Sequence, residues 1–216
     1  MNLRNSENVW VLAGFLGVTG ILAALILSVV SRLTAEPVRQ ARLKGELQML
    51  KALSLPEFDN DMTAESFHIN GVKYMAARKD GKIVGFAAES SSKSGYSGLL
   101  RALTGFDAQG NVLAVQIIEH KETPGLGAAV CERKFQKTIF NLFDAEPAGL
   151  PPNAILDQFK NKNRKTAGNW KISKDGGEFA YRTGATVTSR AVTAMVDSAA
   201  ANLGEAMKYF SGGNAK

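Results

Sequence analysis

The longest apolar stretch of the chain lies near its N-terminus. No charged residue occurs within residues 8–31. A helix needs about 20 apolar residues to cross a bilayer, and Trp10 stands at one end of the stretch, where interfacial aromatic residues lie. A cleaved export signal has an apolar region of only about 7–15 residues. The pattern therefore predicts an N-terminal tail of residues 1–8 and an uncleaved transmembrane helix over residues 9–31.

A weaker apolar pattern continues beyond this predicted membrane helix. Leu47, Leu50 and Leu53 recur among charged residues, and Pro56 is expected to end a helix there. We therefore expect a juxtamembrane helical stalk over residues 32–60, packed on the following domain or on a partner.

The middle of the chain alternates short apolar runs with turn residues, which is typical of antiparallel strands. Asp80-Gly81 separates the first two runs and is a strong signal for a two-residue hairpin. A second hairpin is expected around residues 107–110, and the run after it is apolar on both faces, which predicts a central strand. The four predicted strands cover residues 72–78, 82–88, 98–106 and 112–119.

Turn and helix signals follow the last of these strands. Pro124-Gly125 suits the central positions of a type II turn, and Gly127 is expected to take a positive φ before a helix over residues 128–143. Proline and glycine residues then predict a loop over residues 144–153. One more short strand is expected from the apolar residues Trp170, Ile172 and Phe179.

The last predicted helix begins with a segment rich in hydroxyl side chains, TGATVTS, at residues 183–189. Thr188 and Ser189 are expected N-cap residues, and Gly184 allows a ligand to approach the backbone closely. The N-terminus of a helix also favours phosphate. The segment is therefore either a capped helix start alone or a phosphate-binding site. The whole pattern predicts an α+β fold, in which one transmembrane helix precedes an antiparallel sheet with packed helices.

Composition and charge narrow the chemistry. The 26 basic residues outnumber the 20 acidic ones, but they form no cluster, so nucleic acid binding is not expected. Cys131 is the only cysteine, and His68 and His120 are the only histidines. These counts exclude an intrachain disulfide and argue against a metal site. No Walker loop, nucleophile elbow or acid–base pair is evident, so we expect no catalytic residue.

Three motifs, together with the N-terminal anchor, carry a family resemblance. They are HKETPGLG at residues 120–127, TGATVTS at residues 183–189 and SGYSGLL at residues 94–100. The combination resembles the covalent-FMN-binding domain family, and within it the G subunits of Rnf-type electron transport complexes. The resemblance covers about residues 10–208. It places the FMN-binding domain at residues 61–210, followed by a tail of residues 211–216.

The resemblance implies a covalent attachment site in the hydroxyl-rich segment. FMN would be joined through a phosphoester to the threonine that follows Gly184-Ala185, which is Thr186. A flavin transferase would take the FMN from FAD. Ala185 is small and leaves room for the phosphate. The amides expected to face that phosphate are those of Val187, Thr188 and Ser189.

The loop at residues 122–127 is the candidate for contacts with the isoalloxazine ring. Leu126 would pack on a ring face, and Thr123 with backbone amides would meet the polar edge of the ring. Glu122 and Gly127 complete this expected set. Tyr96 would either stack on the ring or belong to the core.

By the same resemblance, the chain is an electron-carrying subunit that is not catalytic alone. The parent complex couples electron transfer between ferredoxin and NAD to ion movement across the inner membrane. Its partners would be other membrane and peripheral subunits, a flavin transferase during maturation and the lipid bilayer. The FMN domain would lie on the periplasmic side. Basic residues after the membrane helix favour the cytoplasm instead, but that rule is weak for large domains.

Other functions remain open at this point. One is the homologous C subunit of a sodium-pumping NADH:quinone reductase. Another is a membrane-anchored binding module without flavin, which is supported by Ala180, where the family usually carries aspartate. Asp175 and Glu178 lie nearby but out of register. A free-standing flavin reductase is the third, and the absence of a recognisable nicotinamide site argues against it.

Overall fold

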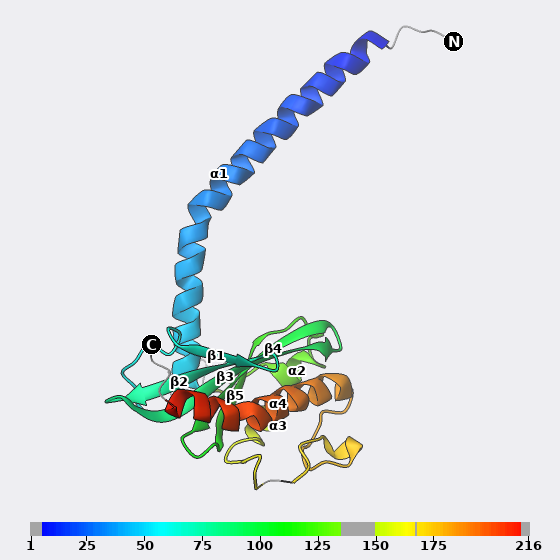
Figure 1. Ribbon diagram of the computed structural model, residues 1–216. Helices are drawn as coiled ribbons and strands as arrows, with labels where there is room; N and C mark the ends of the chain where they lie inside the picture. Colours follow the sequence, from blue (N-terminus) through cyan, green and yellow to red (C-terminus); the bar gives the residue numbers. More distant parts are fainter. Residues whose placement is uncertain (1–5, 135–149, 167, 213–216) are drawn as a thin grey trace, which may run out of the picture. The chain divides into compact units, whose positions relative to one another are not determined.

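The computed structural model describes residues 6–134, 150–166 and 168–212 (Figure 1). The chain divides into two compact units, residues 1–48 and residues 49–216.

Helix α1 (Ser6–Ala52) forms most of the first unit and ends in the second. Among the described residues, Trp10–Ala35 is the one helical stretch that is long and apolar enough to cross a membrane. This stretch agrees with the predicted transmembrane helix. The helix continues through Pro37 and ends at Ala52, four residues before Pro56, where the sequence suggested a stop.

The second unit is built on a five-stranded antiparallel sheet in the order β1-β2-β3-β4-β5. The predicted meander is confirmed, with a short first strand and a longer β3 that the sequence pattern did not indicate. Polar residues fill the second half of β3, which explains why its alternation was not visible. The strands are β1 (Ser66–Ile69), β2 (Val72–Lys79), β3 (Lys82–Gly95), β4 (Gly98–Asp107) and β5 (Val112–Glu119).

Both predicted hairpins are present. Asp80 and Gly81 join β2 to β3 with φ angles of 51° and 73°, as a type I′ turn requires at both central positions. In the second hairpin, Asp107 accepts hydrogen bonds through Oδ1 from the N–H groups of Gln109 and Asn111, at 2.9 and 2.8 Å. An aspartate that accepts hydrogen bonds from the amides of the residues that follow it stabilises such a turn locally, without contacts from the rest of the fold.

The prediction that residues 112–119 form a central strand is wrong, because β5 lies at the edge of the sheet. Other parts of the chain cover its outer edge. Val112 exchanges backbone hydrogen bonds with Asn161 and Lys162, at 2.7 and 2.9 Å. Farther along, the guanidinium of Arg133 donates to Val115 O at 2.9 Å from Nη2. The strand is apolar on both faces because its edge is covered as well as its faces.

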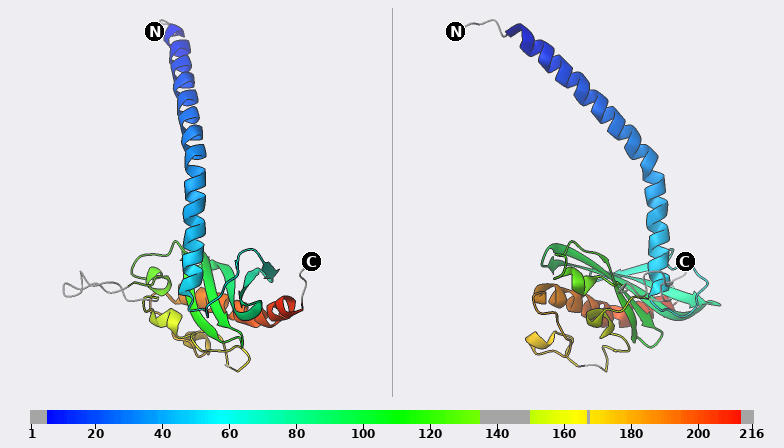
Figure 2. Two further views of the ribbon diagram at one scale, coloured as in Figure 1. Left: turned by 90° about the vertical axis from the view of Figure 1, so that its left-hand side faces the viewer. Right: turned by 180° about the vertical axis from the view of Figure 1, so that it is seen from behind.

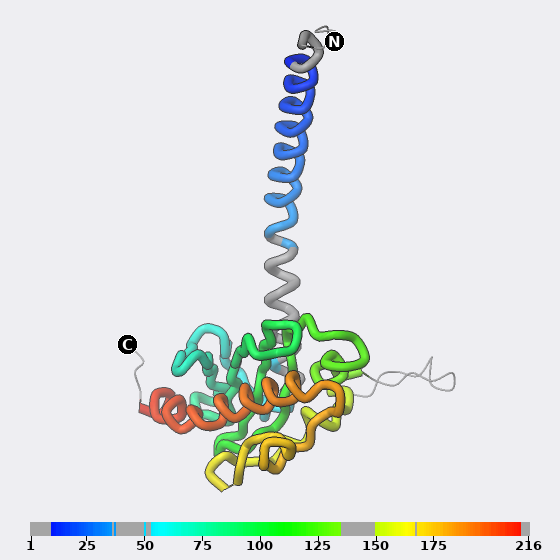
Figure 3. The backbone as a smooth tube through the Cα atoms, turned by 90° about the vertical axis from the view of Figure 1, so that its right-hand side faces the viewer, coloured from blue at the N-terminus to red at the C-terminus, as the bar shows by residue number. Residues whose placement is uncertain are grey.

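Helix α4 (Thr186–Ser211) lies along one face of the sheet, as Figures 2 and 3 show. Its apolar side packs on the main core, and Tyr74 Oη on β2 donates to Ala199 O on α4 at 2.6 Å. Burial raises the pKa of Tyr74. The opposite face of the sheet packs against a smaller apolar cluster, which includes Leu50 from the end of α1 and Leu53 just after it.

Two further expectations need correction. The helix expected over residues 128–143 is only α2 (Ala128–Cys131), because Glu132 takes an extended conformation with ψ 140°. This turn of the backbone directs Arg133 toward β5, while residues 135–143 lie outside the described residues. The strand expected around Trp170 is a single bridge between Ile172 and Phe179, and the short helix η1 (Ser173–Asp175) lies between them. Helix α3 (Ala154–Asp157) completes the described elements.

Candidate functional site

The turn at residues 123–126, here called the TPGL turn, forms as the sequence predicts. Leu126 N–H donates to Thr123 O at 3.2 Å, and Gly125 has a φ of 79°, so Pro124-Gly125 occupy the centre of a type II turn. Gly127 does not take the expected positive φ, since its value is −63°. A Cβ at Gly127 would lie 2.3 Å from Glu122 Oε2, so this position needs glycine because the carboxylate lies against its backbone.

The hydroxyl-rich segment runs into the first turn of α4, and the helix begins three residues earlier than a cap at Thr188 would require. The N-cap is Ala185, and Gly184 before it has a φ of 82°. Thr188 and Ser189 are therefore inside the helix, both fully buried, and the prediction that they cap it is wrong. Ser189 N–H is bonded to Ala185 O, which leaves the amides of residues 186–188 as the free donors of the first turn.

Glu122 joins these segments. Its side chain is only 5% exposed. Thr188 Oγ1 in α4 donates to Glu122 Oε2 at 2.9 Å, and Ser97 N–H in the β3–β4 turn donates to Oε1 at 3.1 Å. The three motifs, far apart in sequence, therefore meet at one buried carboxylate, and Figure 3 shows the start of α4 beside the segment that holds α2.

Two more contacts hold the TPGL turn against the start of α4. Arg182 Nη2 donates to Gly125 O at 3.3 Å. A Cβ at Gly184 would lie 3.3 Å from Leu126 Cδ2, so glycine there lets the leucine approach the backbone. Ser97 and Arg182 were not among the predicted site residues. The SGYSGLL motif was the signal for Ser97, whereas nothing in the sequence marked Arg182.

The surface around Thr186 combines polar and apolar groups. Thr186 is half-buried, and Ala185 before it is buried. Within the described part of residues 49–212, the large apolar side chains that remain exposed all come from the three converging segments. They are Tyr96, Leu99, Leu126 and Val187, so Tyr96 is not part of the core.

This arrangement fits a phosphorylated ligand with a planar apolar part. A hydroxyl at a helix start, free amides behind it and Arg182 nearby suit a phosphate. Leu126 and Val187 offer apolar contact beside it. Among the described residues, no group of three or more histidine, cysteine, aspartate or glutamate side chains lies close enough together to hold a metal ion.

Ala180, where the sequence lacks the family aspartate, is bonded through its backbone to Gln158. The two acidic residues nearby are engaged elsewhere. Asp175 pairs with Arg190 at 2.6 and 2.8 Å, and this guanidinium lowers the pKa of the carboxyl group. Glu178 lies 3.3 Å from Lys162.

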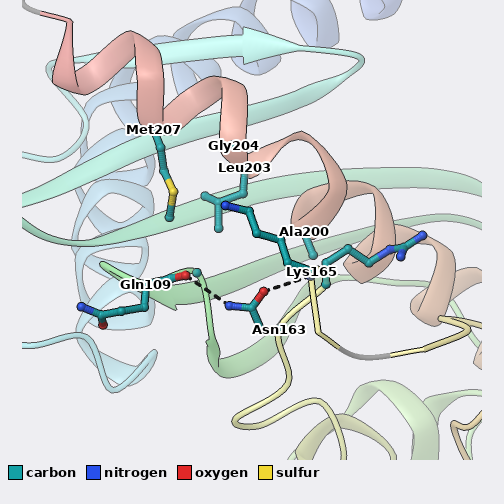
Figure 4. A pocket seen from close by; sticks show the side chains of 9 residues that line it. Gln109, Asn163, Lys165, Ala200, Leu203, Gly204 and Met207 are labelled. Carbon is teal, nitrogen blue, oxygen red and sulfur yellow. Dashed lines mark hydrogen bonds between the residues drawn. The ribbon is translucent and has the colours of Figure 1, made fainter.

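Two hollows of the surface lie away from this site. One has a volume of about 20 Å³, enough for a single water molecule, and lies between Asn163 and α4 near Leu203 and Met207 (Figure 4). The other is a cleft of about 310 Å³ between Trp170 and the Arg190–Asp197 stretch of α4. The cleft reaches Arg190, one helical turn after Thr186, but neither hollow is lined by Leu126 or Val187.

Comparison with known proteins agrees with the geometry. Residues 95–201 match the family model of the FMN-binding domain. The chain is 35% identical over 189 residues to the G subunit of the ion-translocating oxidoreductase complex of Photorhabdus laumondii, covering 84% of this chain and 81% of the relative. It is 35% identical to the protein of the same name in Yersinia pestis, covering 85% and 82%. For the Pseudomonas aeruginosa protein the identity is 31%, covering 96% and 88%.

Cys131 is the last residue of α2 and is fully buried. Burial, with smaller contributions from Glu122 and Glu132, raises the pKa of its thiol to about 12.

We expect iodoacetamide at pH 8 to leave the folded protein unlabelled and to label the urea-denatured protein fully. In the unfolded chain the pKa of the thiol is near 9.0, so the unfolded state loses this proton at a lower pH than the folded state. The contribution of the buried thiol to folding stability is therefore fully present below pH 9 and is lost as the pH rises toward 12. Rapid labelling of the folded protein at pH 8 would contradict the buried position.

Proposed function

Because the chain belongs to the family of G subunits of ion-translocating oxidoreductase complexes, we propose that it is a membrane-anchored flavoprotein subunit that carries electrons within such a complex. The anchor is the Trp10–Ala35 stretch of α1. Other subunits of the complex are its partners, as the names of its relatives imply. The C subunit of a sodium-pumping reductase was an alternative on sequence grounds, and these relatives favour the G subunit.

The observation that carries this proposal is the convergence of the TPGL turn with the first turn of α4. It creates one surface with a hydroxyl, free helix amides and apolar side chains. We infer that Thr186 Oγ1 is the atom to which FMN is joined by a phosphoester. Thr183 is exposed outside the helix, and Thr188 is buried against Glu122, so neither presents its hydroxyl at the helix start as Thr186 does.

The residues that would hold FMN have separable roles. The amides of residues 186–188 and the dipole of α4 would bind the phosphate oxygens. Leu126 would contact a face of the ring, and Thr123 lies in the same turn, where its side chain is exposed. When bound, FMN supplies reversible one- and two-electron transfer. No acid, base or nucleophile of this chain takes part in the electron transfer itself, because the subunit passes electrons and does not transform a substrate.

The proposal includes the side of the membrane and the maturation partner. The FMN domain lies on the periplasmic side, and a flavin transferase that uses FAD attaches the FMN. A reporter fused after Lys216 tests the topology. We expect activity from alkaline phosphatase, which functions only outside the cytoplasm. Activity from a reporter that functions only in the cytoplasm would reverse the assignment.

Thr186→Val should abolish flavin attachment and leave the fold intact, because valine keeps the shape and the α4 core is unchanged. Thr183→Val is the matched control and should retain the flavin. Mass spectrometry of peptides from protein co-expressed with a flavin transferase checks both. FMN mass on a peptide without Thr186, or undiminished in-gel fluorescence of Thr186→Val, would end the assignment.

Leu126→Ala should keep the attached flavin and shift its midpoint potential, because the ring loses an apolar neighbour. The leucine is about half exposed, so we expect stability to change by no more than about 0.5 kcal/mol. Leu55→Ala, at a partly buried leucine on the opposite face of the sheet, is the control and should leave the potential unchanged. Redox titration of both variants decides the question, and a Leu126→Ala potential equal to wild type would remove the turn from the flavin site.

A further inference from the structure

Glu122 has a role that its place in the TPGL motif does not reveal. We propose that it is a positioning residue for flavin attachment, which fixes Thr186 by binding the side chain of Thr188. This inference rests on the proposed attachment of FMN at Thr186. It assigns the carboxylate to the protein framework and not to the flavin ring.

The first turn of α4 needs such a contact because it has no side-chain cap. Its N-cap residue is Ala185, which makes no capping hydrogen bond, and helix ends without a cap fray readily. Thr188 is the third helical residue, and its Oγ1 donates to Glu122 Oε2 at 2.9 Å in a buried setting. This tertiary hydrogen bond to a carboxylate satisfies no amide of the first turn, but it ties the turn to the rest of the domain and leaves those amides free for a phosphate.

The other end of this contact is fixed as well. Glu122 Oε1 accepts from Ser97 N–H at 3.1 Å. A Cβ at Gly95 would lie 2.7 Å from Oε1, and one at Gly127 would lie 2.3 Å from Oε2. The carboxylate thus occupies a cradle with glycine backbone on two sides. Through Glu122, the Thr188 side chain is therefore connected to the β3–β4 turn as well as to the TPGL turn.

The position of Thr186 matters for the attachment step itself. In that step the bond between the FMN phosphorus and the bridging oxygen of FAD breaks, and a bond from phosphorus to Thr186 Oγ1 forms. AMP leaves with the bridging oxygen, and the hydroxyl proton passes to the transferase or to solvent. The reacting oxygen must lie where the transferase can present FAD to it, so a displaced first turn slows the reaction even in a folded protein.

The experiment compares attachment rates in the full-length, detergent-solubilised chain, produced without transferase and then mixed with purified transferase and FAD. Thr188→Val and Glu122→Ala break the contact, whereas Thr188→Ser and Glu122→Gln retain groups that can make it. Tyr74→Phe is the matched control, because it removes another buried hydrogen bond between the sheet and α4, at Ala199, far along the helix from Thr186. Thermal unfolding of each variant measures its loss of stability.

We expect Thr188→Val and Glu122→Ala each to slow attachment by about 10- to 100-fold, and the double variant to be no slower than either. Thr188→Ser, Glu122→Gln and Tyr74→Phe should attach flavin at close to the wild-type rate. If Tyr74→Phe is slowed as much as Thr188→Val at equal loss of stability, or if Thr188→Val is not slowed, the positioning role is overturned. Wild-type protein without flavin on Thr186 would instead overturn the proposed function.

Discussion

The buried carboxylate of Glu122 is the constraint on which the site depends. A carboxylate removed from water is destabilising unless hydrogen bonds replace those it made to solvent. Here the donors are Ser97 N–H and Thr188 Oγ1, which come from a strand turn and from a helix. Satisfying this one group therefore requires three separate segments to lie together. A Cβ at Gly127 would lie 2.3 Å from the carboxylate, and one at Gly95 would lie 2.6 Å from the backbone oxygen of Gly98 and 2.7 Å from the carboxylate.

Local chemistry predicted much of the fold. Asp80-Gly81 specified its hairpin through turn geometry alone, and Pro124-Gly125 did the same for the turn before α2. The incorrect predictions concern features that depend on residues far away in the sequence. The apolar residues on both faces of β5 suggested a central strand. Its outer edge is instead covered by Arg133 and by residues 161–162, and no local sequence pattern indicates this contact.

The site shows the same division. The motif predicts Thr186 as the attachment residue, and this stays a prediction, whereas the contact between Thr188 and Glu122 was not predicted. A threonine near a helix start suggests a cap by local rules, and only the position of Glu122 shows that its hydroxyl points into the protein. Gly127 was misinterpreted for a related reason. Its sequence context suggests unusual backbone angles, whereas the structure needs the absence of a side chain.

Anchoring and attachment suit an electron carrier. A helix that spans the membrane keeps the flavin near other membrane-bound centres, which raises its effective concentration there. The proposed phosphoester would leave the ring chemically unmodified, so contacts with the ring would tune its electron transfer. A high-resolution structure of the flavin-loaded protein tests this account most directly. It should show density running from Thr186 Oγ1 through the phosphate to a ring in van der Waals contact with Leu126. A flavin joined to another residue, or a ring seated in the cleft beside Trp170 and away from Leu126, would contradict it.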